Sequence, residues 1–195
     1  MIEASEKFRR AIERFDAANA DDPDGEEVIY ARRMSEWLER LEPDASEALK
    51  LAARSQHIRR WEIPRNRYPI NRAGYHRWRN ELAGFHAEVA GKILREVGYG
   101  EAMVGRVQSL LRKERLKEDA EAQTLEDVIC LVFLENYFAD FAREHDEQKL
   151  IGILRKTWRK MSERGHAAAL NLPMADAERK LVEKALKPDD RGESR

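Results

Sequence analysis

One stretch of the sequence, residues 54–79, concentrates side chains that bind anions and transfer protons. It holds eight arginines, two tryptophans, two tyrosines and two histidines but one acid, Glu62, which gives a net charge of +7. Arginine offers a planar set of donors that matches phosphate and carboxylate groups, and its guanidinium stacks on aromatic rings. The whole chain has a net charge of −1, so the other residues sum to −8. The basic charge is therefore local, which argues against a protein that coats nucleic acid along its surface.

Three interpretations of this basic segment stay open: an anion-binding site, ion pairing with the acidic remainder of the chain, or plain surface. Arginines near the end of a helix offset its dipole and cover apolar surface with their stems, which accounts for two or three of them. The others lie in a loop or at the start of the next helix, where positive charge is mildly unfavourable. We therefore expect an anion-binding site. Its predicted ligand-binding residues are Arg60, Trp61, Arg65, Arg79, Lys113 and Lys117.

Titratable residues could give this site catalytic groups. His57 closes one expected helix, His86 lies within the next long helix, and Asp127 lies one turn into the most apolar helix. A carboxylate in that position has two explanations. It caps the helix at N3 with Thr124 as the N-cap residue, or it points into a site shared with His57 and His86. The predicted catalytic residues are His57, Asp127 and His86, and a divalent metal, if one is bound, would be held by His57 and Asp127.

Other features limit the class of protein. The sequence has no glycine-rich phosphate loop, no GxSxG elbow, no CxxC pair and no HExxH motif. The single cysteine, Cys130, lies in the apolar run VICLVFL and is typical of a buried thiol in a cytoplasmic protein. No apolar stretch approaches the ~20 residues that span a membrane, and the first residues have no signal-peptide core. We expect a cytoplasmic protein with no membrane partner.

The elements that must position these side chains are helices, because helical periodicity runs through the chain and no segment alternates like a strand. Asp44 and Glu47 are expected to form a capping box, and Gly98 to end the longest helix. The fold class is all-α, a compact HD-domain-like arrangement of about eight or nine helices. The predicted domain spans residues 1–187, followed by a flexible tail at 188–195. Helices are expected near residues 3–19, 24–41, 45–60, 74–97, 101–115, 125–144, 147–161, 165–170 and 175–186, with an ordered loop at 62–73.

Two family resemblances extend this interpretation. The strings AARSQHIRRWEIPRNRYPINRAGYHRWRNEL, LEDVICLVFLE and LRKTWRKMSERGH resemble the family called domain of unknown function 4202, over nearly the whole chain. More weakly, LKLAARSQHI and LEDVICLVF resemble the HD superfamily of helical metal-dependent phosphohydrolases. This second resemblance places His57 at the histidine of the His-Asp pair and Asp127 at the final aspartate. Ile58 then stands at the paired aspartate, and Tyr30 or Arg33 at the first histidine.

The function expected from these features is binding of a phosphorylated or nucleotide-like anion in a pocket rich in Arg, His and Trp. Phosphohydrolase activity, with or without a divalent metal, is the enzymatic form of this hypothesis. The alternative is a non-catalytic module that binds RNA or another protein through its Arg and Trp surface. In the RNA case Trp61 or Trp78 would stack on a base.

Overall fold

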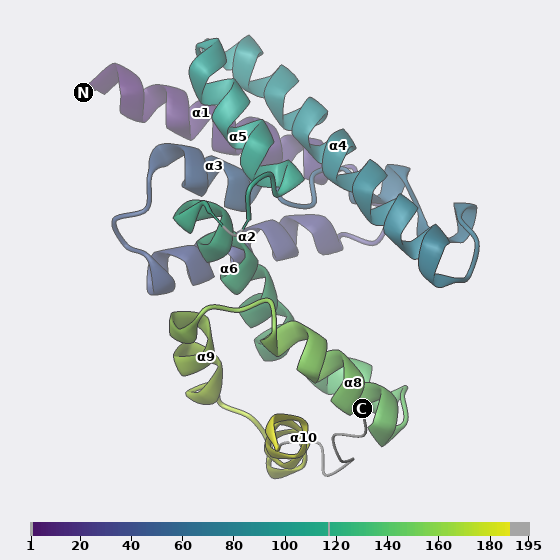
Figure 1. Ribbon diagram of the computed structural model, residues 1–195. Helices are drawn as coiled ribbons and strands as arrows, with labels where there is room; N and C mark the ends of the chain where they lie inside the picture. Colours follow the sequence, from purple (N-terminus) through teal and green to yellow (C-terminus); the bar gives the residue numbers. More distant parts are fainter. Residues whose placement is uncertain (1, 117, 188–195) are drawn as a thin grey trace. The chain divides into compact units, whose positions relative to one another are not determined.

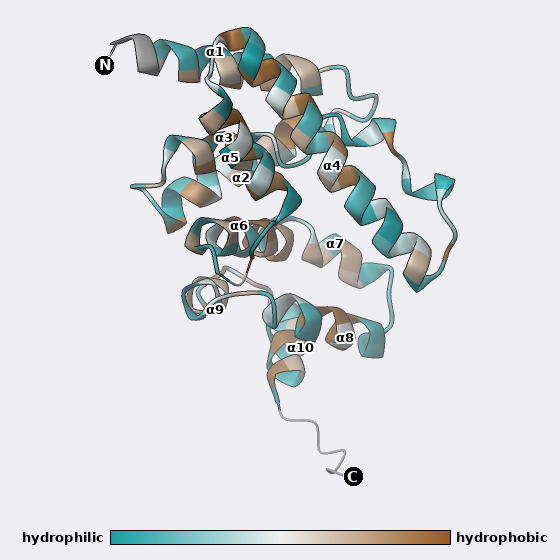
Figure 2. Ribbon diagram, turned by 45° about the horizontal axis from the view of Figure 1, so that its top comes forward, coloured by the Kyte–Doolittle hydropathy of each residue, from teal (hydrophilic) through white to brown (hydrophobic). Residues whose placement is uncertain are grey.

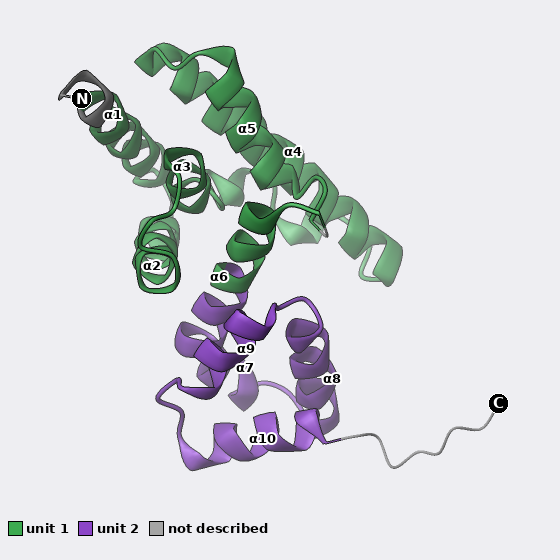
Figure 3. Cartoon of the chain, turned by 60° about the vertical axis from the view of Figure 1, so that its left-hand side comes forward, with its two compact units in different colours: residues 1–128 green, residues 129–195 purple. Residues whose placement is uncertain are grey.

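The computed structural model describes residues 2–116 and 118–187, and all regular elements within them are helices (Figure 1). The all-α fold class is thereby confirmed. None of the helices in these ranges combines the length and the apolar character that crossing a bilayer requires. Contacts group the chain into two compact units, residues 1–128 and 129–195 (Figure 3). The single domain over 1–187 stays a prediction, and the predicted flexible tail at 188–195 lies outside the described residues.

The first unit is built from helices that pack mainly in pairs. The long helix α4 lies beside α5, and α1 packs against α4 (Figure 1). Helix α3 contacts α1, α2 and α5, so it lies at the centre of this unit. The elements are α1 (Ile2–Asn19), α2 (Glu26–Leu41), α3 (Glu47–Arg54), the short 3₁₀ helices η1 (Arg60–Glu62) and η2 (Arg65–Arg67), α4 (Arg72–Val97), α5 (Glu101–Arg112) and the start of α6 (Ala120–Asn136).

The core of the first unit follows from apolar residues at helical spacing. Helix α2 buries Tyr30, Met34, Trp37, Leu38 and Leu41, which fall on one face because they recur every three or four residues. Helix α3 is short, yet most of its side chains are buried because other helices surround it. Gly98 ends α4 with a left-handed backbone (φ 97°), as its position in the sequence predicted.

The start of α3 differs from the sequence prediction. Ser46 is the N-cap residue, and its hydroxyl accepts a hydrogen bond of 3.2 Å from the Leu49 N–H. The predicted capping box of Asp44 and Glu47 is wrong, because the helix begins later than expected and Glu47 is its first residue. Glu47 instead accepts a 2.7 Å hydrogen bond from the Tyr99 hydroxyl, which ties α3 to the turn before α5. The helix also ends at residue 54 and not near residue 60.

The start of α6 corrects a second prediction. Asp119 caps this helix, since its carboxylate accepts hydrogen bonds of 3.0 and 3.3 Å from N–H groups of the first turn. Thr124 lies inside the helix and its hydroxyl donates to the Ala120 carbonyl at 3.0 Å. The predicted cap formed by Thr124 and Asp127 is therefore wrong. The burial of Asp127 needs another explanation.

The second unit consists of short helices. Apolar residues run through much of α6 (Figure 2). The helix is interrupted at Tyr137, so the single helix predicted at 125–144 is two helices, α6 and α7. Helix α8 packs against α10, and the Arg155 guanidinium donates a 3.1 Å hydrogen bond to the Ala185 carbonyl. The elements after α6 are α7 (Phe138–Arg143), α8 (Glu147–Trp158), α9 (Glu163–Leu170) and α10 (Asp176–Leu186).

The loop between α3 and α4 is ordered, as predicted. The Arg65 guanidinium donates to the carbonyls of Tyr68 and Pro69, each at 2.9 Å. The Trp78 indole N–H donates to the Ile63 carbonyl at 2.8 Å. Because these bonds satisfy backbone carbonyls that no helix uses, the loop has one defined conformation. Tyr68 of the loop forms a small apolar cluster with Trp78 and Leu82 of α4, and Ile63 packs against it.

Gly74 brings α4 into close contact with this loop. Its N–H donates a 2.7 Å hydrogen bond to the Asn71 side chain, which is the N-cap of α4. A Cβ atom at Gly74 would overlap the Pro69 carbonyl oxygen, which belongs to the backbone and cannot turn aside. Glycine is therefore required here by the approach of two backbone segments.

Gly74→Ala should lower the free energy of unfolding by about 1–3 kcal/mol, because the added methyl group forces the loop away from α4. Chemical denaturation would measure the change. Gly84→Ala is the matched control, since Gly84 lies in the same helix and a Cβ atom there meets nothing within 4 Å. The control should be neutral or up to about 1 kcal/mol more stable. Equal effects of the two substitutions would contradict the close approach.

Candidate functional site

The candidate site is formed at the turn that joins α3 to η1, residues 55–59. The Ser55 hydroxyl donates to the Leu51 carbonyl at 2.8 Å, which continues the end of α3. Arg59 has a left-handed backbone (φ 53°), a conformation that costs energy for a residue with a side chain. The buried Asn19 holds it there, because its side-chain oxygen accepts a 2.9 Å hydrogen bond from the Arg59 N–H. The turn places His57 between α2 and α4.

His57 is held on three sides. Its ring stacks on Tyr30 of α2 with 3.9 Å between ring centroids. Its Nε2 lies 3.1 Å from a guanidinium nitrogen of Arg60, and its Nδ1 lies 3.6 Å from Oε2 of Glu27. A guanidinium can only donate, so Nε2 accepts and the neutral ring carries its proton on Nδ1, towards Glu27.

His86 of α4 faces the same turn and is 3% exposed. Its Nδ1 lies 2.8 Å from the Ile58 carbonyl oxygen, which can only accept a hydrogen bond. The proton is therefore on Nδ1, and Nε2 presents a lone pair. That Nε2 atom is buried and has no hydrogen-bond partner. The His57 and His86 ring centroids are 6.0 Å apart, so two imidazoles with acceptor Nε2 atoms lie side by side.

Both histidines are neutral at neutral pH. Burial lowers the pKa of His57 well below its ordinary value, and the charge of Arg60, followed by His86, Arg79 and Lys113, lowers it further. Burial also lowers the pKa of His86 to about 3, although its hydrogen bond to the Ile58 carbonyl opposes the shift. The imidazoles therefore act as hydrogen-bond acceptors or bases, and neither adds a positive charge to a region that already has several.

Glu27 is the acid of the site, and the sequence prediction did not include it. Its side chain is 13% exposed, and its carboxylate lies near both His57 and Arg60. Burial raises the pKa of Glu27 to about 7, although the charge of Arg60 opposes the increase. A signal for it exists in the sequence, because Glu27 precedes Tyr30 and Met34 by three and seven residues and so falls on the buried face of α2.

Three cations, Arg60, Arg79 and Lys113, lie close enough to His57 for their charges to lower its pKa. Arg60 is largely buried, lies 4.9 Å from the Trp78 ring centroid, and has its pKa lowered by burial. Arg79 is half-buried on α4 and forms no ion pair within the described residues. Lys113, at the end of α5, is ion-paired with Glu126 of α6. The structure thus brings together five residues that the sequence analysis had named: His57, His86, Arg60, Arg79 and Lys113.

The other predicted site residues have different surroundings. Arg65 is bound to loop carbonyls, and Trp61 is half-buried in η1. Asp127 is 2% exposed and accepts a 3.0 Å hydrogen bond from the Gln123 side chain, one turn earlier in α6. Lys117 lies outside the described residues. A joint role of Asp127 and His57 in one site stays a prediction.

The predicted metal ligands, His57 and Asp127, are not part of a larger group of metal-binding side chains within the described residues. In residues 2–116 and 118–187, no three or more side chains of His, Cys, Asp and Glu lie where they could hold a metal ion. His57 also directs its acceptor Nε2 towards Arg60, a cation that would repel a metal. The residues present in these ranges do not fit a metal centre of the HD type.

Several arginines of the basic segment have structural partners, in agreement with the ion-pairing interpretation. Arg54 forms a two-point pair with Asp16 of α1 at 2.8 and 2.6 Å, with little exposure. Arg59 is ion-paired with Glu62 within the turn. The Arg54 pair attaches the segment to α1, and Arg60 and Arg79 are the cations of the segment whose charges reach both histidines.

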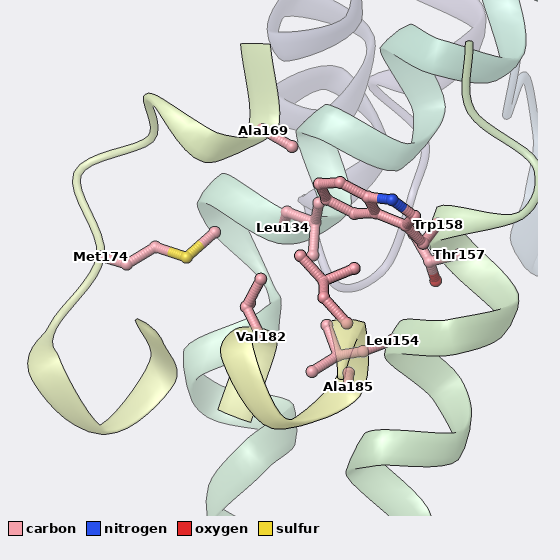
Figure 4. A pocket seen from close by; sticks show the side chains of 9 residues that line it. Leu134, Leu154, Thr157, Trp158, Ala169, Met174, Val182 and Ala185 are labelled. Carbon is pink, nitrogen blue, oxygen red and sulfur yellow. The ribbon is translucent and has the colours of Figure 1, made fainter. Parts of the chain in front are cut away.

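A separate cavity lies in the second unit and has a different character. Side chains from α6, α8, α9 and α10 surround it, and none of them is charged (Figure 4). The Trp158 ring at its edge stacks on His166 with 4.2 Å between ring centroids. This cavity is a gap in apolar packing and offers no group for proton transfer. Its lining residues are Leu134, Leu154, Thr157, Trp158, Ala169, Met174, Val182, Ala185 and Leu186.

The fold and the site define an all-α protein that holds two neutral histidines and one high-pKa carboxyl group among arginines. The chain belongs to the family described as domain of unknown function DUF4202, whose family model matches residues 9–182. This confirms the first of the two resemblances, and the HD resemblance stays a prediction. No curated protein and no solved structure matches the chain.

The carboxyl group of Glu27 gives a testable pH dependence. Folded Glu27 keeps its proton up to about pH 7, whereas the ordinary pKa is 4.5. The folded state therefore binds more protons than the unfolded state between these values, and stability falls as pH rises through them. Glu27→Gln has no ionisable group at this position and therefore lacks this loss of stability. Relative to the parent protein, the variant should gain on the order of 3 kcal/mol in free energy of unfolding between pH 4.5 and 8.

Denaturation curves recorded across this pH range measure the difference, and any effect of His86 cancels because both proteins contain it. Glu36→Gln is the control, since Glu36 is exposed on the same helix. Stability curves of the parent and Glu27→Gln that stay parallel from pH 4.5 to 8 would refute the buried carboxyl group.

Proposed function

We propose that the residues around His57 bind a small phosphorylated ligand through Arg60, Arg79 and Lys113. The observation that carries the proposal is the position of Arg60, 3.1 Å from Nε2 of the neutral His57, in a region that the charges of Arg79 and Lys113 also reach. Like charges gathered in a partly buried region repel each other and are costly to desolvate, and a bound anion offsets both costs. A phosphate group suits arginine forks better than a single carboxylate does, since it offers more acceptor oxygens.

The surroundings of Arg79 and Arg60 support this assignment. Arg79 forms no ion pair in the described part of the chain, so its guanidinium has donors to offer a ligand. Arg60 donates to the neutral Nε2 of His57 and lies 4.0 Å from Glu27, a carboxyl group that binds a proton near neutral pH. A phosphate dianion is a stronger partner than either group and would draw the Arg60 guanidinium towards itself.

Phosphohydrolase activity is the catalytic form of this proposal. When Arg60 turns to a phosphate, Nε2 of His57 becomes an available base, while Nδ1–H remains directed at Glu27. A carboxyl group beside Nδ1–H helps to orient the imidazole, which accepts a proton from a water that attacks phosphorus. The bond from phosphorus to the ester oxygen then breaks, and the imidazolium returns the proton to the departing alcohol. His57 is the general base in this scheme and Glu27 the positioning residue.

The RNA-binding alternative receives less support. Trp78 is 8% exposed, and its indole N–H is bound to the Ile63 carbonyl, so its ring is not available to stack on a base. Trp61, half-buried in η1, is the tryptophan that this alternative retains. Binding of another protein by the same segment stays a prediction. The exposed Ile70, 98% exposed at the tip of the loop, is the residue that favours it.

Isothermal titration with inorganic phosphate tests the binding proposal. The parent protein should bind phosphate, and Arg79→Gln should weaken binding about tenfold or more, since a charge-assisted hydrogen bond contributes about 1.5–3 kcal/mol. Arg72→Gln is the matched control, because Arg72 is exposed at the start of the same helix and should bind normally. Absence of binding at millimolar phosphate, or equal losses in the two variants, would exclude the site.

The catalytic form is tested separately with p-nitrophenyl phosphate. Turnover by the parent protein should fall at least a hundredfold in His57→Gln, because loss of a general base typically costs that much. If the parent protein binds phosphate but does not turn over the ester, the binding proposal stands and the hydrolase proposal is refuted.

A further inference from the structure

Two buried atoms of the site, Nε2 of His86 and Oε2 of Glu27, have no hydrogen-bond partner within the described residues. Oε2 of Glu27 lies 3.6 Å from Nδ1 of His57. Nε2 of His86 is buried and presents a lone pair, because the proton of the ring is fixed on Nδ1 by the Ile58 carbonyl. A buried acceptor without a donor lowers the free energy of unfolding by about 1–3 kcal/mol. An apolar side chain of similar size would not carry this desolvation cost. The protein also does not resolve the problem by protonation, since burial keeps the pKa of His86 near 3.

The nearby donors of the protein are directed elsewhere. Arg60 donates to Nε2 of His57, and no hydrogen bond joins Arg60 or Arg79 to His86 in the described residues. The charges of both arginines nevertheless reach His86. The unpartnered acceptor therefore lies in the same region as the cations that would hold a phosphate.

The positive charge of this region limits which ligand group could donate a hydrogen bond to Nε2 of His86. An ammonium group or a metal ion would be repelled by Arg60 and Arg79. A hydroxyl group is neutral, donates one hydrogen bond, and brings no charge of its own. The fitting ligand thus combines an anion for the arginines with an uncharged donor for the imidazole.

Building on the proposed function, we propose that the ligand is a phosphate monoester with a hydroxyl group close to the phosphate, as in polyol and sugar phosphates. Its phosphate binds Arg60 and Arg79, and its hydroxyl donates to Nε2 of His86. His86 is then the residue that distinguishes a hydroxylated ester from a plain alkyl ester. A site built to bond a hydroxyl discriminates strongly against an analogue that lacks it, because the analogue leaves the buried acceptor unpaired.

Two esters with the same carbon skeleton test this inference. Isothermal titration of the parent protein at pH 7.5 would compare glycerol 3-phosphate with n-propyl phosphate, which has no hydroxyl group. Glycerol 3-phosphate should bind about tenfold tighter or more, the equivalent of one hydrogen bond to a buried acceptor. Equal affinities of the two esters would overturn the inference while leaving phosphate binding in place.

The variant His86→Asn tests whether Nε2 of His86 causes the preference for glycerol 3-phosphate. Its amide can still donate to the Ile58 carbonyl in place of Nδ1–H, but it has nothing at the position of Nε2. The two esters should bind this variant equally, and n-propyl phosphate should bind it as it binds the parent protein. A preference that survives in His86→Asn, or an equal loss for both esters, would overturn the role of Nε2.

Arg79→Gln separates this inference from the function on which it rests. It should weaken both esters by the same factor and keep their ratio, because it removes a phosphate contact and leaves His86 intact. If neither ester nor inorganic phosphate binds the parent protein, the proposed function fails, and the inference fails with it.

Discussion

The hydrogen bond between Nδ1 of His86 and the Ile58 carbonyl is the interaction on which the site depends. It is buried, 2.8 Å long, and joins the longest helix to the turn after α3. Because it fixes the proton of His86 on Nδ1, it also makes Nε2 the hydrogen-bond acceptor of the ring. The same turn is held from the other side by Asn19 and carries His57 against Tyr30. One backbone carbonyl thus sets the position and the chemistry of the imidazole in α4.

The site collects groups that burial makes unfavourable. A half-neutral carboxyl group, two imidazoles held neutral and two arginines lie within one region of a helical unit, and they lower or raise one another's pKa. Apolar side chains would pack there at less cost in stability. Clusters of perturbed titratable groups are typical of functional sites, where such costs are balanced by ligand binding. The ion pair of Arg54 with Asp16 contrasts with this, since it satisfies its own charges.

Much of the fold could be predicted from the sequence, because apolar spacing of three and four residues fixes helices and their buried faces. Gly98 and the ordered loop followed from local chemistry. Caps were less predictable, since Ser46 and Asp44 are both good N-cap residues and the packing of α3 decides between them. Within the site, His57, His86 and Arg60 were foreseen from residue type. Glu27 was missed because acids in a first helical turn are ordinary, and only its position on the buried face of α2 distinguishes it.

Long-range proton–nitrogen NMR of the histidine rings tests the central claim most directly, because it identifies which ring nitrogen carries a proton. At neutral pH, His57 and His86 should each show a protonated Nδ1 and an unprotonated Nε2 in the free protein. Their signals should also not titrate near the ordinary histidine pKa of about 6.5. A proton on Nε2 of His86, or a ring that becomes doubly protonated near pH 6.5, would contradict a buried acceptor at this position and the ligand chemistry inferred from it.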